Sequence, residues 1–236
     1  MIQSTSGLFA QSTEKKEDDS NYSMSVSLTT DTFFGFAPMA SGTYKFSDKL
    51  KFSFYGIFWS GGTPEAWGNW TEFGIGFSYA ASDAITVTPQ LGVLGGTLLS
   101  GGATNSATRA LGDGIVPNLT IDLSTSSLQG QLYAGYYMPI RDLTAKSGAP
   151  STLAYLHYWA NLGYKVSSFF SLGVHYEHLI NTGGSKITTS TDVYQWIGPY
   201  VQFSHPKGGL SLRFAGGSDL TVGRDSFYKM TAMFTF

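Results

Sequence analysis

The sequence contains no cysteine, which excludes disulfide bonds, thiol catalysis and thiolate metal sites. Charged residues are also scarce, because they make up 13% of the 236 residues, about half the share expected of a soluble domain. Lysine and arginine together number 14 against 16 acidic residues, so the chain lacks the basic surface that binds nucleic acid. A surface this poor in charge does not suit a soluble monomer of this size.

Long apolar runs are missing too. The most apolar stretch, residues 84–100, is broken by Pro89, Gln90 and three glycines, whereas a membrane-spanning helix needs about 20 apolar residues in succession. A helical membrane protein is therefore excluded. The first residues lack the basic segment and apolar core of a signal peptide. We expect residues 1–21 to form a disordered or periplasmic N-terminal tail.

From Tyr22 onward, apolar and small polar residues alternate with a period of two. In the first such segment Tyr22, Met24, Val26 and Leu28 alternate with serine and threonine. This is the period of a β-strand and not of a helix. It recurs without a break in composition, so we predict a single β-domain over residues 22–236. The predicted strands are 22–36, 39–46, 50–60, 68–79, 84–95, 115–124, 128–140, 152–166, 169–180, 188–204, 209–217 and 226–236.

Short turns alternate with longer connections along this series of strands. The turns at 47–49, 80–83 and 166–168 contrast with the links at 60–69 and 96–114. Short connections at one end, long loops at the other and an even strand count are typical of outer-membrane barrels. We therefore predict an all-β fold, an antiparallel up-and-down transmembrane β-barrel of about twelve strands.

Polar and charged side chains occupy the face of the strands that alternates with the apolar face. They are too costly to desolvate for a close-packed core, so this face meets water. Since the polar face is thin in charge, it suits a water-filled lumen with lipid outside better than the exterior of a soluble sandwich. The predicted pore-lining residues are Asp31, Lys51, Glu72, Asp122, His157, Trp159, Lys165, His175, Glu177, Asp192, Arg213 and Lys229.

Barrel geometry sets the size of this lumen. Twelve strands about 4.8 Å apart and tilted by about 40° give a backbone diameter near 24 Å, which leaves room for a passage of roughly 10 Å unless loops or the N-terminal tail fill it. The 96–114 loop is expected to narrow its mouth. Pro89 and Pro199 fall inside predicted strands, where a closed barrel has no free edge. We expect bulges or strand ends at both prolines.

The most concentrated polar group is predicted on neighbouring strands. Pairing through the turn at 166–168 places His157 close to Glu177, with Trp159 and His175 further along the same inward face. We interpret the group as ordinary pore lining, because its spacing matches no known metal-ligand motif. A divalent metal site and a pH-dependent gate are the alternatives. No cofactor is predicted.

Two further features bear on the solute. Inward carboxylates and inward basic residues nearly cancel, and a pore for acidic sugars would show a basic track, so the balance favours weak ion selectivity or a neutral solute. Inward aromatic residues provide stacking platforms, while those near strand ends equally fit interfacial or loop-packing positions. These residues are Tyr55, Trp59, Trp70, Tyr133, Tyr137, Trp159, Tyr194 and Trp196.

A lipid-modifying barrel enzyme is a weaker alternative. It would need an outward serine and histidine in contact. His178 has outward parity, but Ser190 has inward parity. We therefore predict that the protein is not an enzyme.

The last residues, YKMTAMFTF, end on phenylalanine with apolar residues at alternate positions. This pattern resembles the carboxy-terminal strand of Gram-negative outer-membrane β-barrels, which their assembly machinery recognises. The resemblance assigns that signal to Tyr228, Met230, Phe234 and Phe236. Residues 28–46 resemble the first hairpin of small porins of the TorF type. Gly35 is present, but the arginine of those porins is absent, so no substrate or site is carried over.

Together these features predict an outer-membrane channel for passive diffusion of small hydrophilic solutes or ions. The alternative is a non-conducting barrel that serves as a structural or partner-binding subunit. Expected partners are outer-membrane lipid, the barrel-assembly machinery and a small solute, with an oligomer or accessory membrane proteins as a further option. Nucleic acid is not expected as a partner.

Overall fold

The computed structural model describes residues 21–60, 69–96, 98–100, 111–140, 152–184 and 188–236. Its strands form one closed antiparallel barrel in which each strand pairs with its neighbours in sequence. The predicted all-β, up-and-down barrel of twelve strands is confirmed. The strands are β1 (Tyr22–Asp31), β2 (Gly35–Lys45), β3 (Leu50–Ser60), β4 (Asn69–Ala80), β5 (Ile85–Gly95), β6 (Leu111–Ser124), β7 (Leu128–Pro139), β8 (Ala154–Lys165), β9 (Phe170–Gly183), β10 (Thr191–Ser204), β11 (Leu210–Asp219) and β12 (Ser226–Thr235).

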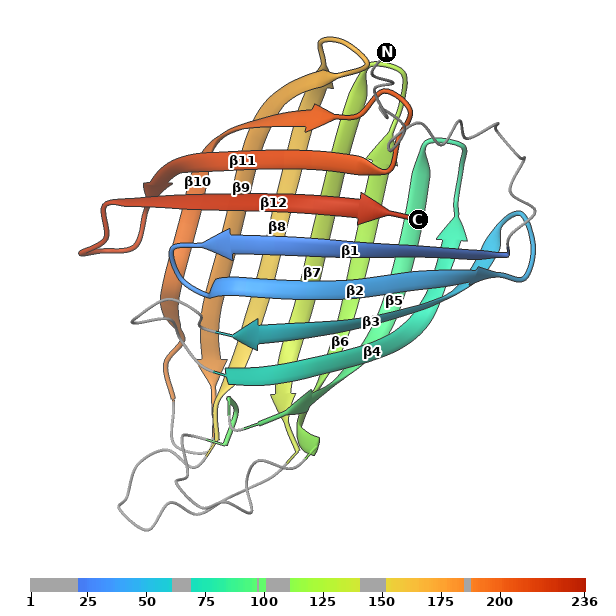
Figure 1. Ribbon diagram of the computed structural model, residues 1–236. Coiled ribbons are helices and arrows are strands. Elements are labelled where there is room, and N and C mark those ends of the chain that lie inside the picture. The colour runs from blue at the N-terminus through green and yellow to red at the C-terminus, as the bar shows by residue number, and fades with distance from the viewer. Residues whose placement is uncertain (1–20, 61–68, 97, 101–110, 141–151, 185–187) are drawn as a thin grey trace, which may run out of the picture.

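The first and last strands close the barrel, as the alternating tail predicts. β1 and β12 lie side by side in Figure 1, with a register that runs from Ser25 opposite Thr235 to Asp31 opposite Lys229. The backbone N–H of Phe236 extends this pairing by donating to the carbonyl of Met24 at 2.8 Å. Closure pairs the backbone groups of both edges, which lipid could not hydrogen-bond. Residues 1–20, most of the predicted tail, lie outside the described residues.

Serine and threonine shape the short turns at one end of the barrel. Ser47 Oγ accepts from the N–H of Leu50 at 3.1 Å, and Thr125 Oγ1 accepts from the N–H of Leu128 at 2.8 Å. Such side chains satisfy turn amides that have no ladder partner. Tyr22 and Thr235, the outer ends of β1 and β12, also lie at this end. We call it the short-turn end, and the opposite one the long-loop end.

Large apolar side chains cover the outside of the barrel. Phe58, Ile75, Leu162 and Phe214 are 52%, 60%, 57% and 51% exposed, respectively, and all have outward parity. Soluble monomeric proteins rarely expose an apolar surface of this extent. It matches the lipid-facing band of a transmembrane barrel. In the described part of the chain, no helix is long and apolar enough to cross a membrane.

The expectation of bulges or strand ends at Pro89 and Pro199 is wrong. Both lie within strands, and the register is the same on either side of each proline. Each proline interrupts the pairing of its strand with one neighbour only. The interrupted ladder is β4–β5 at Pro89 and β10–β11 at Pro199. Pro38 and Pro117 interrupt one ladder in the same way. A missing N–H thus costs local pairs without displacing the strand.

Candidate functional site

The lumen is filled unevenly, and the packed part surrounds Glu177. This side chain is 0% exposed, and both of its oxygens are engaged. Oε1 lies 2.9 Å from His157 Nε2 and accepts from the Tyr194 hydroxyl at 2.8 Å. Oε2 lies 3.1 Å from His175 Nε2 and accepts from Lys229 Nζ at 2.6 Å. We call Glu177, His157, His175, Tyr194 and Lys229 the charged core.

Strand pairing explains part of this core, since β8 and β9 pair as expected and bring His157 beside Glu177. Lys229 comes from β12, which is not a neighbour of β9, so the ion pair crosses the lumen. The lysine ammonium and the Tyr194 hydroxyl, both of which donate to this carboxylate, suit its ionised form, because a buried charge is tolerated only when it is paired and hydrogen-bonded. The described residues include no group of three or more potential ligands with the geometry of a metal site.

Asp31 connects the charged core to the β1–β2 turn. Its Oδ2 lies 4.0 Å from Lys229 Nζ, and its Oδ1 accepts from the backbone N–H groups of Phe33 and Phe34 at 2.9 and 2.6 Å. Gly35 then leaves the turn with a φ of 68°, a left-handed conformation that glycine adopts without strain. The turn therefore directs two phenylalanines into the lumen, which strand alternation did not predict.

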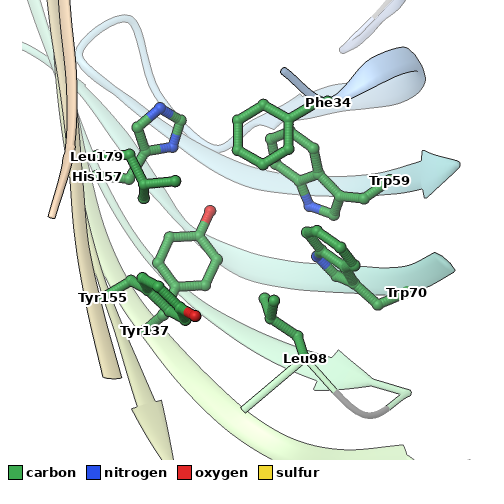
Figure 2. A pocket seen from close by; sticks show the side chains of 8 residues that line it. All are labelled: Phe34, Trp59, Trp70, Leu98, Tyr137, Tyr155, His157 and Leu179. Carbon is green, nitrogen blue, oxygen red and sulfur yellow. The ribbon is translucent and has the colours of Figure 1, made fainter. Parts of the chain in front are cut away.

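Phe34 belongs to a layer of large side chains that closes the long-loop end (Figure 2). Its ring centroid lies 4.5 Å from that of Trp59 and 5.7 Å from that of His157. The free volume within the layer is about 10 Å³, roughly the room that one water molecule needs. We call this set the aromatic layer: Phe34, Trp59, Trp70, Leu98, Tyr137, Tyr155, His157 and Leu179.

Part of the predicted 96–114 loop contributes to this closure. Leu98 lines the aromatic layer, and Leu99 is fully buried. The N–H of Leu99 donates to Asp113 Oδ2 at 2.7 Å, and its carbonyl accepts from the N–H of Leu153. Residues 97 and 101–110 lie outside the described part of the chain. The passage of roughly 10 Å that the barrel diameter allows is filled at this level by the aromatic layer, to which the loop contributes Leu98.

A cavity of about 360 Å³ lies along the inner wall formed by β1 to β8, and we call it the vestibule. Inward-facing side chains at the short-turn end, including Lys51, Met233 and Thr235, are exposed, which connects the lumen to solvent there. The vestibule is bounded toward the long-loop end by Trp59 and Tyr137 of the aromatic layer. Other residues that line it are Ser23, Ser25, Met39, Ser41, Gly42, Thr43, Ser53, Phe54, Tyr55, Ile57, Glu72, Ser78, Thr88, Gln90, Asn118, Thr120, Asp122, Gln131, Tyr133 and Trp159.

Two carboxylates in the vestibule wall are held by neutral donors. Glu72 is 2% exposed and accepts from the Tyr55 hydroxyl at 2.5 Å and from Trp59 Nε1 at 3.4 Å. Asp122 Oδ1 accepts from Gln131 Nε2 at 2.9 Å. Both predicted pore-lining acids therefore lie inside the barrel, Glu72 within the wall and Asp122 facing the cavity.

The side of the lumen facing the vestibule is packed around Tyr200 and Arg213. Arg213 lies over the Tyr200 ring, 4.9 Å from its centroid, and Arg213 Nε donates to Gln202 at 2.9 Å. The Tyr200 hydroxyl lies so close to Gly163 that a Cβ there would be 2.0 Å away. The absence of a side chain at Gly163 therefore lets Tyr200 pack against the barrel wall. Arg213 faces the lumen, as its parity predicts.

Asp192 is placed differently from its prediction as a pore-lining residue. Its Oδ1 lies 2.8 Å from Nε2 of His178, whose outward parity puts it on the opposite face from Glu177. A bulge between Asp192 and Tyr194 shifts the register of β10 and reverses the parity that the sequence pattern assigned. His178 also bonds the Tyr158 hydroxyl at 2.9 Å. Among the described residues, no hydrogen bond joins His178 to Ser190.

The remaining predicted residues lie where strand alternation puts them. Lys51 and Lys165 are near the short-turn end, where Lys165 Nζ donates to the Thr125 carbonyl at 2.7 Å. Trp159 stacks on Tyr133, with ring centroids 3.9 Å apart. The terminal residues assigned to the assembly signal face outward, and each is at least partly exposed: Tyr228 42%, Met230 49%, Phe234 37% and Phe236 78%.

Comparison with solved structures relates the barrel to porins. A structure of the NanC porin is 11% identical, with a TM-score of 0.52 over 89% of this chain and 98% of that chain. A protein from a study of in-meso crystallization of membrane proteins is 8% identical, with a TM-score of 0.53 over 91% and 83%. The KdgM porin, solved with disordered oligogalacturonate, is 13% identical, with a TM-score of 0.48 over 91% and 99%.

The first two likenesses show a shared barrel fold, at identities too low to carry a substrate. A search among curated proteins gives no significant match. The model of a family of unknown function, DUF6733, matches residues 1–236. The chain therefore belongs to the DUF6733 family and has the barrel architecture of outer-membrane porins.

Proposed function

We propose that this protein is an outer-membrane channel for passive diffusion of small hydrophilic solutes or ions. The observation that carries the proposal is a vestibule of about 360 Å³, lined by hydroxyl, amide and carboxylate groups together with apolar side chains, inside a closed barrel with an apolar exterior. A structural barrel has no need of such a cavity, whereas a channel requires one. The polar lining performs no chemistry in this proposal, which assigns the protein no enzymatic activity.

The apolar exterior and the carboxy-terminal strand support a location in the outer membrane of a Gram-negative bacterium. Outer-membrane barrels have short turns on the periplasmic side and longer loops outside. By this rule the short-turn end, with the vestibule opening, faces the periplasm. The aromatic layer lies toward the extracellular side.

In this mechanism the vestibule admits a hydrophilic solute, and the aromatic layer limits the passage of that solute. One ring of the layer, that of Phe34, comes from the β1–β2 turn, in which Asp31 accepts from the N–H groups of Phe33 and Phe34. A displacement of that turn would withdraw the Phe34 ring from the layer without breaking a strand ladder, since residues 32–34 lie between β1 and β2. The resting conductance is therefore small, and the turn sets it.

The second candidate is a non-conducting barrel with a structural or partner-binding role. One observation favours it, namely that the charged core and the aromatic layer fill the lumen at the long-loop end with buried side chains. The two candidates differ in whether the vestibule is part of a continuous pathway. A permeation assay separates them.

The test is swelling of liposomes that contain the purified protein, with neutral sugars of increasing size as osmolytes. Wild-type protein should allow small sugars to enter. Thr120→Trp should slow entry, because it fills the vestibule, while the outward-facing Leu119→Trp on the same strand should leave entry unchanged. Entry that is absent in all three would contradict the channel and favour the closed barrel, and equal entry through all three would contradict a pathway through the vestibule.

A further inference from the structure

The vestibule has a distinctive side-chain chemistry. Its polar lining consists mainly of hydroxyl and amide groups, and no lysine, arginine or histidine is among the described residues that line it. Hydroxyls and amides both donate and accept hydrogen bonds. They match a solute whose own groups are hydroxyls, and they offer an anion no compensating charge.

The two carboxylates do not turn this cavity into a cation site. Glu72 is almost fully buried behind Tyr55 and Trp59, both of which donate to it. Asp122 is held by Gln131, whose side-chain carbonyl in turn accepts from Trp159 Nε1 at 3.1 Å. The acids thus orient the neutral groups that line the cavity.

Several polar groups in the vestibule remain available to a solute. The hydroxyls of Ser41, Thr43 and Thr120 form no hydrogen bond with another described side chain, although they line the cavity. Tyr133, which pairs with Thr120 across β6 and β7, stacks on Trp159 with an interplanar angle of 14°. A flat aromatic wall next to unengaged hydroxyls is suited to the apolar face and the hydroxyl edge of a pyranose ring.

We propose that the vestibule is a binding site for an uncharged polyhydroxylated solute of oligosaccharide type. This inference names a solute class for the proposed channel, and its physiological role depends on that channel function. A volume of about 360 Å³ lies in the lower part of the range for small-molecule pockets, so the site takes two or three sugar rings. Acidic oligosaccharides of equal length bind more weakly, since no lysine, arginine or histidine among the described lining residues compensates their charge.

Isothermal titration calorimetry of the detergent-solubilised protein tests this site. Maltotriose is the neutral probe, trigalacturonate is the acidic probe, and the glucosamine trimer is the cationic probe. Saturable binding of maltotriose is expected, with weaker binding of both charged probes. Thr43→Val with Thr120→Val, which removes two hydroxyls at nearly constant volume, should weaken maltotriose binding by about fivefold or more. The outward-facing Thr30→Val should have no effect.

The proposal is overturned if maltotriose produces no saturable heat, if either charged probe binds as tightly, or if the double variant binds as well as wild type. Titration needs no transport, so its outcome is separate from that of the channel. Maltotriose binding without permeation would remove the channel and keep the site. Permeation without maltotriose binding would remove the binding site and keep the channel.

Discussion

The charged core and the vestibule lie in the same lumen, but the core is tightly packed and the vestibule is open. In the core, Glu177 and Lys229 are joined at 2.6 Å among buried rings, and little room is left for water. In the vestibule, short hydroxyl and amide side chains leave about 360 Å³ open. Because the backbone of the barrel is continuous, the difference lies in side-chain size and pairing. The core therefore governs stability and closure, and the vestibule governs what enters.

Lys229→Met should have the largest effect on the core. It leaves the Glu177 carboxylate buried with no full cation and removes the partner of Asp31. Loss of one member of a buried ion pair costs about 3–5 kcal/mol. Urea unfolding of the protein in lipid vesicles would measure the loss. The exposed Lys51→Met is the matched control, and an equal loss in both variants would contradict the special role of the core.

Gly163→Ala should have the next largest effect. The added Cβ would meet the Tyr200 hydroxyl at 2.0 Å, so the ring and Arg213 above it must shift toward the lumen. Such overpacking costs about 1–3 kcal/mol in the same unfolding assay. Gly216→Ala, whose Cβ would find its nearest neighbour at 3.5 Å, should cost much less. Equal costs at both glycines would argue against the position of Tyr200.

Tyr194→Phe should weaken the core to a smaller extent. Its hydroxyl donates to Glu177 at 2.8 Å and lies 2.9 Å from His157 Nε2, both of which stay in place in the variant. Removing one hydrogen bond to a buried charged group costs about 1–3 kcal/mol. We expect a value near the lower limit, because three donors to the carboxylate remain. A neutral outcome would show that the hydroxyl is dispensable.

Thr120→Val in the vestibule should change stability least. Its half-buried hydroxyl has no described side-chain partner, so the unfolding free energy should stay within about 0.5 kcal/mol of wild type. The same variant is expected to weaken neutral-sugar binding. A stability loss as large as that of Tyr194→Phe would erase the distinction between the two regions.

The sequence predicted those parts of the fold that depend on local alternation. A period of two located twelve strands, and the parity of β8 and β9 placed His157 beside Glu177. The prediction was wrong for Asp192, because one bulge reverses parity without leaving a compositional trace. Contacts across the lumen, such as that of Glu177 with Lys229, join strands that do not pair, so no pairing rule could predict them.

The closure of the lumen was also beyond the sequence pattern. The predicted strand 22–36 extended over Phe33 and Phe34, but β1 ends at Asp31 and both phenylalanines lie in the turn to β2. Asp31 accepts hydrogen bonds from the backbone N–H groups of both phenylalanines, and these bonds fix the direction of the two side chains. The bonds depend on the geometry of the turn. A Thr-Asp pair before two aromatic residues is the only local sign of it.

Single-channel recording in planar bilayers tests the central claim, a hydrated pathway narrowed by the β1–β2 turn, most directly. Wild type should give small conductance steps, and Phe34→Ala should give larger ones because it removes a ring that closes the lumen. Phe36→Ala, on the exposed outer face of the same hairpin, should match wild type. Conductance that is absent from all three proteins, or unchanged by Phe34→Ala, would contradict the account.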